Sequence, residues 1–242
     1  MKNEELEQLL SNLRLGKVAE MLDAELRKAS KGQPSYEDFL LHLLRAQWQH
    51  QEERTLERRI GRAGMPELWT LETFPFDKQK GVSRRQIRGF AGLDFVNRAE
   101  NIVFIGETGV GKSALATGLL IKALQNGYRG VFVEAQALFD EMYSSLADRS
   151  TRKLLNRLAR VDLLVIDELG YLNLRPEHTN VFFRLMEERY RHKATIITTN
   201  VDYEQWPDIF GNQALCKALL SRLRHHCHTI RIDGPSLREP TG

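Results

Sequence analysis

Apolar residues near the start of the chain recur at helical spacing. One helical face is marked at positions i, i+3, i+4 and i+7 by Leu6, Leu9, Leu10 and Leu13. We expect one amphipathic helix over residues 4–29, ended by Gly32 and Pro34. A second amphipathic stretch begins at Ser35 and ends near Pro66. Residues 1–66 carry no chemical motif. We therefore predict a small all-α N-terminal domain that serves oligomerisation or contact with DNA or another partner.

Beyond residue 67 the pattern changes to short apolar runs that alternate with helical segments. The runs predict buried strands at 102–105, 131–134, 163–167, 195–199 and 229–232. Helices fit at about 113–126, 136–147, 150–160, 177–192 and 213–224. Strands that alternate with helices are typical of a parallel sheet covered on both faces. We therefore predict an α/β three-layer core over residues 67–242.

A glycine-rich loop lies between the first predicted strand of this core and its first helix. It completes the pattern G-x-x-x-x-G-K-[ST] with Gly106, Glu107, Thr108, Gly109, Val110, Gly111, Lys112 and Ser113. The backbone N–H groups of such a loop, and the positive end of the helix after it, bind phosphate oxygens. The Lys reaches the β- and γ-phosphates and the Ser hydroxyl binds Mg²⁺. We therefore predict a nucleotide site here. The alternative is a glycine-rich turn without a ligand.

Two acids end the predicted strand at 163–167, at the edge where α/β proteins bind ligands. Asp167 is placed to hold Mg²⁺, directly or through water, opposite Ser113. Glu168 is placed to orient or deprotonate a water that attacks the γ-phosphate. The pair predicts hydrolysis as well as binding. The alternative is a strand that ends in a polar turn.

Polar side chains also follow the next strand and the last helix. Thr199 and Asn200 end the strand at 195–199, where they can point at the γ-phosphate and hold the attacking water. A capped strand end is the alternative. Arg222 follows a helical segment and could neutralise transition-state charge in a neighbouring subunit. A surface Arg without such a role fits the residues equally well.

Composition limits the class of protein. The 242 residues are 42% apolar and 28% charged, which is ordinary for a globular protein. No stretch approaches the ~18 apolar residues that span a membrane, and the N-terminus lacks the apolar core of a signal peptide. The two cysteines, Cys216 and Cys227, make no disulfide framework, so we expect a cytoplasmic protein.

Charge adds little to this picture. The net charge is only +3. Residues 76–100 form a modest basic segment, in which the acids Asp77, Asp94 and Glu100 stand against Lys78, Lys80, Arg84, Arg85, Arg88 and Arg98. Such a run is usually a solvated face, so DNA contact through this segment is the less favoured interpretation.

Together these motifs resemble the AAA+ ATPases, and among them the IstB-like family, the ATP-binding helper proteins of bacterial insertion sequences. The matching runs are Asp-Glu-Leu-Gly-Tyr-Leu at 167–172, Glu-Arg-Tyr at 188–190, Thr-Ile-Ile-Thr-Thr-Asn at 195–200, Trp206 with Ile-Phe-Gly at 209–211, and Leu-Ser-Arg-Leu-Arg-His-His-Cys-His at 220–228. The last two are far more specific than the phosphate loop, and the resemblance covers roughly residues 5–238. Glu107 and Thr108 depart from the family, which often has two prolines there, and Asn173 stands where Pro is common.

The resemblance implies both the cofactors and the task of the protein. It implies ATP and Mg²⁺, with Asn200 as the first sensor and Arg222 as an arginine finger that acts in trans. It implies a homo-oligomeric helper of DNA transposition that binds duplex DNA and recruits or stimulates a separate transposase. ATP hydrolysis would then drive disassembly. Because only 20 residues follow Arg222, we expect no helical lid after the core.

Other functions share the phosphate loop. A DnaC-type helicase loader has the same core and would bind a replicative helicase and single-stranded DNA. A small-molecule phosphotransferase would need an Arg-rich lid and an acceptor pocket, whereas the Asp-Glu pair and the polar strand end favour water as the acceptor. An ATP-binding module without hydrolysis is less favoured because of Glu168.

Overall fold

The computed structural model describes residues 2–170, 172, 174 and 176–238. The chain divides into two compact units, residues 1–58 and 59–242. None of the helices in the described residues combines the length and apolar character needed to cross a bilayer.

The N-terminal unit is built from three helices around a small apolar core. They are α1 (Lys2–Asn12), α2 (Gly16–Gly32) and α3 (Tyr36–Ala63), the last of which continues into the second unit. Each helix contributes one buried residue to this core, Leu10, Val18 and Leu43. The buried Gln47 of α3 caps α2, because its side-chain oxygen accepts hydrogen bonds from the N–H groups of Lys17 (2.9 Å) and Val18 (3.2 Å). These N–H groups have no partner within their own helix.

The structure corrects the predicted single helix over residues 4–29. The chain turns between α1 and α2, where Arg14 has a left-handed φ of 58°. The Leu15 N–H donates to the Leu10 carbonyl (2.8 Å) and the Arg14 N–H to the Ser11 carbonyl (3.0 Å), the hydrogen bonds of a Schellman helix end. That left-handed position usually holds Gly. With Arg there, the sequence carries no signal for the break.

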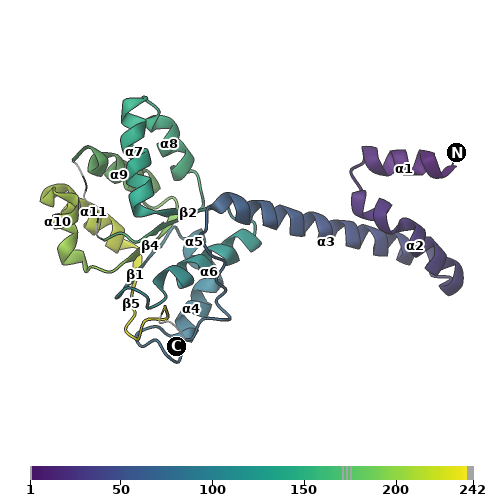
Figure 1. Cartoon of the computed structure of the whole chain (residues 1–242), viewed down its shortest axis with the longest axis horizontal. Coiled ribbons are helices and arrows are strands. Elements are labelled where there is room, and N and C mark those ends of the chain that lie inside the picture. The colour runs from purple at the N-terminus through teal and green to yellow at the C-terminus, as the bar shows by residue number, and fades with distance from the viewer. Residues whose placement is uncertain (1, 171, 173, 175, 239–242) are drawn as a thin grey trace. The chain divides into compact units, whose positions relative to one another are not determined.

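The second unit contains a five-stranded parallel sheet with helices on both faces (Figure 1). The strands are β1 (Asn101–Ile105), β2 (Gly130–Glu134), β3 (Leu163–Asp167), β4 (Ala194–Thr199) and β5 (Cys227–Arg231). Their order is β2-β3-β4-β1-β5, and every pairing is parallel. The predicted α/β three-layer core is confirmed. The last strand begins at Cys227, two residues before the predicted start.

Eight α-helices lie in the described part of this unit after the end of α3. They are α4 (Arg84–Ala91), α5 (Asp94–Asn97), α6 (Lys112–Gln125), α7 (Ala135–Ala147), α8 (Thr151–Ala159), α9 (Pro176–Arg189), α10 (Trp206–Phe210) and α11 (Gln213–His225), with a 3₁₀ turn η1 (Tyr203–Gln205) before α10. The sequence did not predict α4, α5 and α10, which are 8, 4 and 5 residues long. Helices this short show too few turns for a period of 3.6 residues to be recognised.

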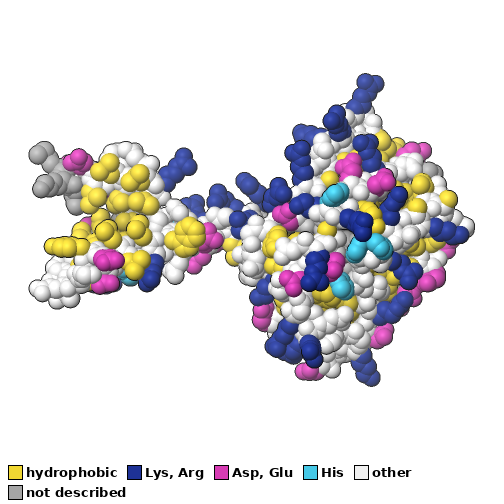
Figure 2. Space-filling view, turned by 180° about the vertical axis from the view of Figure 1, so that it is seen from behind, with side chains coloured by type: hydrophobic (Ala, Val, Ile, Leu, Met, Phe, Trp, Pro, Cys, Tyr) yellow, Lys and Arg dark blue, Asp and Glu magenta, His cyan; other side chains and the backbone are white. Residues whose placement is uncertain are grey.

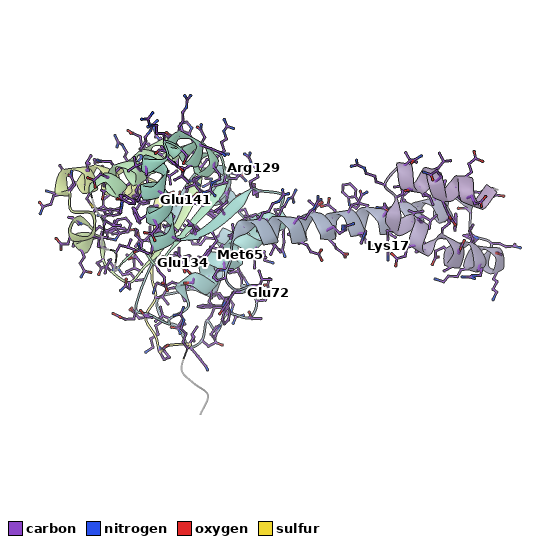
Figure 3. All side chains as sticks on the ribbon, turned by 45° about the horizontal axis from the view of Figure 1, so that its top comes forward. Lys17, Met65, Glu72, Arg129, Glu134 and Glu141 are labelled. Carbon is purple, nitrogen blue, oxygen red and sulfur yellow. The ribbon has the colours of Figure 1, made fainter. Side chains whose placement is uncertain are left out.

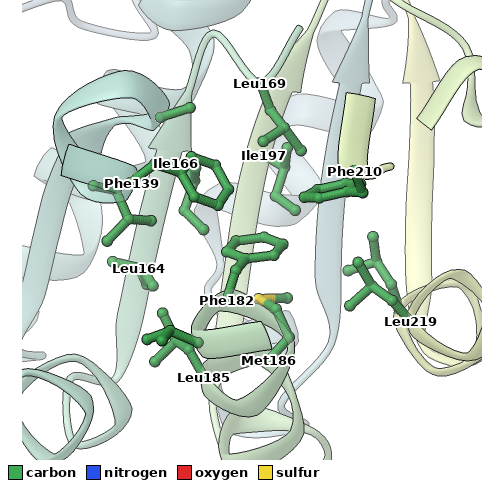
Figure 4. Packing of buried hydrophobic residues seen from close by; sticks show 14 of the residues in the cluster. Phe139, Leu164, Ile166, Leu169, Phe182, Leu185, Met186, Ile197, Phe210 and Leu219 are labelled. Atoms are coloured by element: carbon green, nitrogen blue, oxygen red, sulfur yellow. The ribbon is translucent and has the colours of Figure 1, made fainter. Parts of the chain in front are cut away.

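Alternating strand residues point to the two faces of the sheet. One face packs against α7 to α11. There Ile166 of β3 and Ile197 of β4 lie in the same apolar cluster as Phe182 of α9 (Figure 4). Ile102 and Phe104 of β1 are also buried, and by strand alternation they point to the opposite face, which α6 covers. Because the strands are buried on both faces, they read in the sequence as continuous apolar runs.

A buried arginine joins the ends of several elements. Arg189, the last residue of α9, is 1% exposed. It donates to the Leu158 carbonyl (2.7 Å), the Val161 carbonyl (3.0 Å) and the Thr195 hydroxyl (3.0 Å). The Ala194 carbonyl accepts a further hydrogen bond. Burial lowers the pKa of Arg189 to about 9. The Glu-Arg-Tyr run at 188–190 therefore contains a residue that ties α8, the turn after α8 and β4 together.

Candidate functional site

The phosphate loop joins β1 to α6 at the carboxyl edge of the sheet. Gly109 and Gly111 have φ values of +88° and +93°, a conformation that other residues rarely adopt. The chain then enters α6 at Lys112. A tight loop that runs directly into a helix presents backbone N–H groups and the positive helix end to an anion.

Lys112 lies folded against the loop. It is 8% exposed, and its Nζ donates to the carbonyls of Gly106 and Glu107, each at 2.8 Å. Burial lowers the pKa of the Lys112 ammonium, and the charges of Asp167, Glu168 and Glu107 oppose that shift. The structure thus places a partly desolvated cation near the loop and the two acids at the end of β3, Asp167 and Glu168.

Asp167 ends β3 opposite Ser113 and is 5% exposed. The Thr198 hydroxyl donates a hydrogen bond to its carboxylate. Burial raises the pKa of Asp167. The Thr198 hydroxyl, the nearby Ser113 hydroxyl and Lys112 act to lower this pKa and only partly offset the effect of burial. A divalent cation would stabilise the buried carboxylate. Mg²⁺ is held by few protein oxygens and keeps several waters, so Ser113 and Asp167 fit it.

Glu168 adopts an uncommon backbone conformation. Its φ is 59°, in the left-handed region, and its N–H donates to the Thr198 hydroxyl at 2.9 Å. Residues other than Gly pay an energetic cost there and cluster at functional sites. The turn leaves the Glu168 side chain exposed, although Asp167 and Leu169 on either side of it are buried.

Asn200 follows β4 and lies over Gly170. A Cβ on Gly170 would stand 2.0 Å from the Asn200 Oδ1, so only Gly leaves room for the amide. The Thr199 hydroxyl is turned toward the backbone of Val201, accepting from its N–H at 3.1 Å. Of the two polar residues expected at this strand end, Asn200 is therefore the one that faces the cleft.

A cleft of about 810 Å³ brings most of these residues together, and its volume is in the range of small-molecule sites. The residues of the predicted site that line this cleft are Thr108, Gly109, Gly111, Lys112, Ser113, Asp167, Glu168 and Asn200. Gly106, Glu107 and Val110 belong to the loop but not to the described lining, and Val110 is buried. Tyr171 and Asn173, from the run that follows Glu168, lie outside the described residues.

The sequence did not predict other residues of the cleft. They are Pro66, Glu67, Trp69, Ala114, Thr117, Glu134, Ala135, Gln136, Leu172, Leu237 and Arg238. Glu134, which is labelled in Figure 3, could have been found because it ends an apolar strand as Asp167 does. The two residues are paired in the β2–β3 register. The segments around Trp69 and Leu237 carry no motif, and only the fold brings them to the cleft.

Arg222 lies outside the described lining of this cleft. Its guanidinium is 3.4 Å from the Glu187 carboxylate of α9, and both side chains are about half exposed or more, at 49% and 63%. An exposed pair of this kind is worth roughly 0–1 kcal/mol. Arg224 instead lies over the ring of Tyr203, 5.1 Å from its centroid. The role of Arg222 in a neighbouring subunit stays a prediction.

Comparison with known proteins identifies close sequence relatives. A family model of IstB-like ATP binding proteins matches residues 8–241. The chain is 36% identical over 234 residues to the ATP-binding protein of insertion sequence IS21 from Pseudomonas aeruginosa, which covers 97% of this chain and 88% of that protein. It is 33% identical over 235 residues to the insertion sequence IS5376 ATP-binding protein from Geobacillus stearothermophilus, covering 97% and 94%.

Solved structures share the fold at lower identity. The crystal structure of DnaI has a TM-score of 0.57 at 22% identity, covering 67% of this chain and 92% of that one. The DnaC helicase loader has a TM-score of 0.57 at 24% identity, covering 68% and 96%. These likenesses concern the fold, and with the family match they confirm the predicted AAA+ core.

Proposed function

This chain belongs to the IstB-like ATP binding proteins, and we propose that it is a Mg²⁺-dependent ATPase that assists DNA transposition. The observation that carries this proposal is the cleft in which the phosphate loop faces Asp167, Glu168 and Asn200. Family membership supports ATP as the nucleotide. The carboxylate of Glu168, exposed in the cleft, supports hydrolysis.

Each group has a role in the proposed hydrolysis. Lys112 binds the β- and γ-phosphates. Ser113 and Asp167 would hold Mg²⁺, which would neutralise phosphate charge. Asn200 orients a water toward the γ-phosphorus, and Glu168 accepts a proton as that water attacks. The bond from the γ-phosphorus to the bridging oxygen breaks, so that ADP and phosphate leave, and Glu168 returns its proton to solvent.

Replacing Glu168 with Gln tests this assignment. The amide keeps the shape of the side chain but does not accept a proton, so ATP should still bind while turnover falls by about 10²-fold or more. Phosphate release, measured with no acceptor other than water, reports the rate. ATP affinity, measured by calorimetry, reports the binding.

The control for this experiment is Glu188→Gln, which removes an acid of α9 that pairs with Arg184 outside the described cleft lining. Its turnover should stay close to that of the unmodified protein. If Glu168→Gln hydrolyses ATP at the same rate as this control, Glu168 does not activate the water. If the unmodified protein releases phosphate only when a small-molecule acceptor is added, a phosphotransferase becomes the better proposal.

We propose that duplex DNA binds at the basic face of α8. On the inner side of this helix, its own residues Leu154, Leu155 and Leu158 are buried. Its exposed side and the preceding turn carry Arg149, Arg152, Lys153, Asn156, Arg157 and Arg160, which line one surface hollow together with Ser150 and a single acid, Asp148. Among the described ion pairs, Arg157 alone of these cations meets an acid, Glu141. Figure 2 shows Lys and Arg side chains standing out along the top of the core, the end at which α7 and α8 lie in Figure 1. Exposed cations at helical spacing suit a phosphate backbone.

The double substitution Arg152→Ala with Lys153→Ala should weaken duplex binding and lower its dependence on salt. Each lost phosphate contact reduces the slope of log affinity against log salt by about 1. Fluorescence anisotropy of a labelled duplex measures both quantities. The salt concentration is varied from about 50 to about 200 mM, because affinity that rests on phosphate contacts falls steeply over this range. The matched comparison is Arg84→Ala with Arg85→Ala, in the basic segment that precedes β1. If the α4 pair lowers the slope and the α8 pair does not, DNA binds at α4 instead.

Oligomerisation and transposase contact complete the proposal. We propose that the N-terminal domain, residues 1–66, contributes to assembly. This domain leaves large apolar side chains exposed, among them Leu9 (51%), Leu13 (66%), Leu44 (54%) and Trp48 (64%). Surfaces of this kind support protein association. The assembly would hold DNA with ATP bound, recruit or stimulate a separate transposase, and fall apart on hydrolysis. The insertion-sequence relatives support this role over the alternative of a helicase loader.

A further inference from the structure

A second groove opens on the core where residues 71–76 pass between α4 and α6, two helices that pack against each other (Figure 1). We call it the α4 groove. Its described lining has four apolar residues, Leu71, Phe76, Ile87 and Ala91, and four charged ones, Glu72, Arg84, Arg88 and Lys122. It shares no residue with the described lining of the nucleotide cleft. Its volume is about 230 Å³, below the range of about 300–1,000 Å³ that holds a drug-sized ligand. The groove therefore suits side chains of a larger partner better than a small molecule.

The apolar residues of the α4 groove are held in place by packing within the core. Residues 71–76 lie tightly on α6, because a Cβ on Gly118 would stand only 2.6 Å from the Leu71 Cδ2. The ring of Phe76 meets that of Phe74 edge-on, with centroids 4.8 Å apart. Ile87 of α4 is 1% exposed. The groove is therefore preformed, so a partner side chain could enter it without paying for a rearrangement of the core.

The charges of the α4 groove are unequal. Lys122 of α6 pairs with Glu72 at 2.8 Å, and its hydrogen bond holds the pKa of the Glu72 carboxyl below the usual value. The acid of the groove is thus already matched by a lysine. Arg84 and Arg88 remain, four residues apart on α4, a spacing that places both on one side of the helix. The groove therefore presents two positive charges in excess.

Both arginines have guanidinium groups available for a ligand. Neither forms an ion pair with an acid of the described residues. The Arg84 guanidinium lies over the ring of Phe76, 5.0 Å from its centroid, which keeps this side chain at the groove. A planar guanidinium can donate two parallel hydrogen bonds to a carboxylate. The chemistry that complements the groove is therefore a pair of carboxylates next to an apolar group.

The apolar part of the groove decides between an acidic protein segment and DNA. A phosphate backbone would match the two arginines, but it offers no apolar side chain for the groove between them. The field around α4 is also reduced by exposed acids of the same segment, Asp77 and Asp94. An acidic peptide offers both the charge and the apolar group, so it fits the α4 groove better.

We propose that the α4 groove binds an acidic segment of a partner protein, whose carboxylates pair with Arg84 and Arg88 while an apolar side chain of the same segment enters the groove. Arginine clusters recur as binding sites for acidic motifs. The groove lies on the side of the sheet that α6 covers, whereas α8 belongs to the opposite layer. A partner bound there would leave the basic face of α8 free for DNA. This inference does not depend on the nucleotide site.

Labelled synthetic peptides test the inference by fluorescence anisotropy. The first peptide places glutamates on both sides of one leucine, the second has lysines in place of the glutamates, and the third has alanine in place of the leucine. The first should bind and the second should not. The third should bind about threefold or more weakly than the first, because less apolar surface is buried. The double substitution Arg84→Glu with Arg88→Glu should weaken binding of the first peptide by about tenfold or more, because two attractions become repulsions.

The matched control is Arg85→Glu. It makes the same change of charge on the same helix, next to Arg84, but lies outside the described lining of the groove. Its affinity for the acidic peptide should stay within about twofold of the unmodified protein, because an exposed charge outside the groove is largely screened by salt. Arg88→Glu alone provides a second test, since it keeps the contact between Arg84 and Phe76. Thermal unfolding of each variant shows whether it is folded.

The outcomes are distinct. If the unmodified protein does not bind the acidic peptide, or if Arg85→Glu loses as much affinity as the folded variants of Arg84 and Arg88, the α4 groove is not a peptide site. If those variants lose affinity for a labelled duplex and keep their affinity for the peptide, the two arginines contact DNA instead, which also overturns the inference. Failure of the unmodified protein to bind ATP would contradict the proposed function and leave this inference standing.

Discussion

Lys112→Ala protein should lose ATP binding by about 100-fold or more, which corresponds to about 2.7 kcal/mol. Lys112 is the cation that lies against the loop carbonyls of Gly106 and Glu107. Its burial means that its charge acts on phosphate with little screening by water. Without it, the triphosphate would face Asp167 and Glu168 with no ammonium between them. Calorimetry with ATP and Mg²⁺ measures the loss.

A lysine farther along the same helix provides the control. Lys122 of α6 pairs with Glu72, whose side chain is 64% exposed, and both lie outside the described lining of the cleft. An exposed pair contributes roughly 0–1 kcal/mol to stability, so Lys122→Ala should fold and bind ATP normally. Equal ATP affinity in Lys112→Ala and Lys122→Ala would show that the phosphate loop is not the nucleotide site.

The sequence predicted the core of the fold because its strands are buried on both faces. Runs such as 163–166 are apolar throughout, and the helices between them are long enough to show their period. It failed where the local signal was weak. The break at Arg14 places a non-glycine residue in a left-handed helix end, and α5 has only 4 residues.

The candidate site was predictable only where its residues stand in contiguous motifs. The loop at 106–113 and the acids at the end of β3 could be predicted because each directly follows or ends an apolar strand, the position where α/β proteins bind ligands. The approach of Asn200 to Gly170 depends on the packing of two neighbouring strand ends, which no local pattern reports. The same holds for Trp69 and Arg238, which reach the cleft from segments far from the loop in the sequence.

Arg222→Ala protein should bind ATP nearly normally but hydrolyse it poorly. An arginine finger can contribute 10³–10⁵ in rate, and Arg222 lies outside the described lining of its own cleft. Its exposed contact with Glu187 adds little to stability, so the variant should fold like the unmodified protein. Arg224→Ala is the matched control, because Arg224 lies two residues away on the same helix and contacts the ring of Tyr203. A rate loss in Arg224→Ala alone would move the role to Arg224.

Mixing two inactive proteins tests whether Arg222 acts across a subunit boundary. Lys112→Ala protein keeps an intact Arg222, and Arg222→Ala protein keeps an intact phosphate loop. In a mixed assembly, some Arg222→Ala subunits would have a Lys112→Ala subunit as neighbour. The Arg222 of that neighbour could then act on the intact phosphate loop of the Arg222→Ala subunit, so part of the ATPase rate should return. Mixing ratios from excess of one protein to excess of the other, with co-assembly checked by light scattering, give the recovery curve. If co-assembled mixtures recover no activity at any ratio, Arg222 acts within its own chain or has only a structural role.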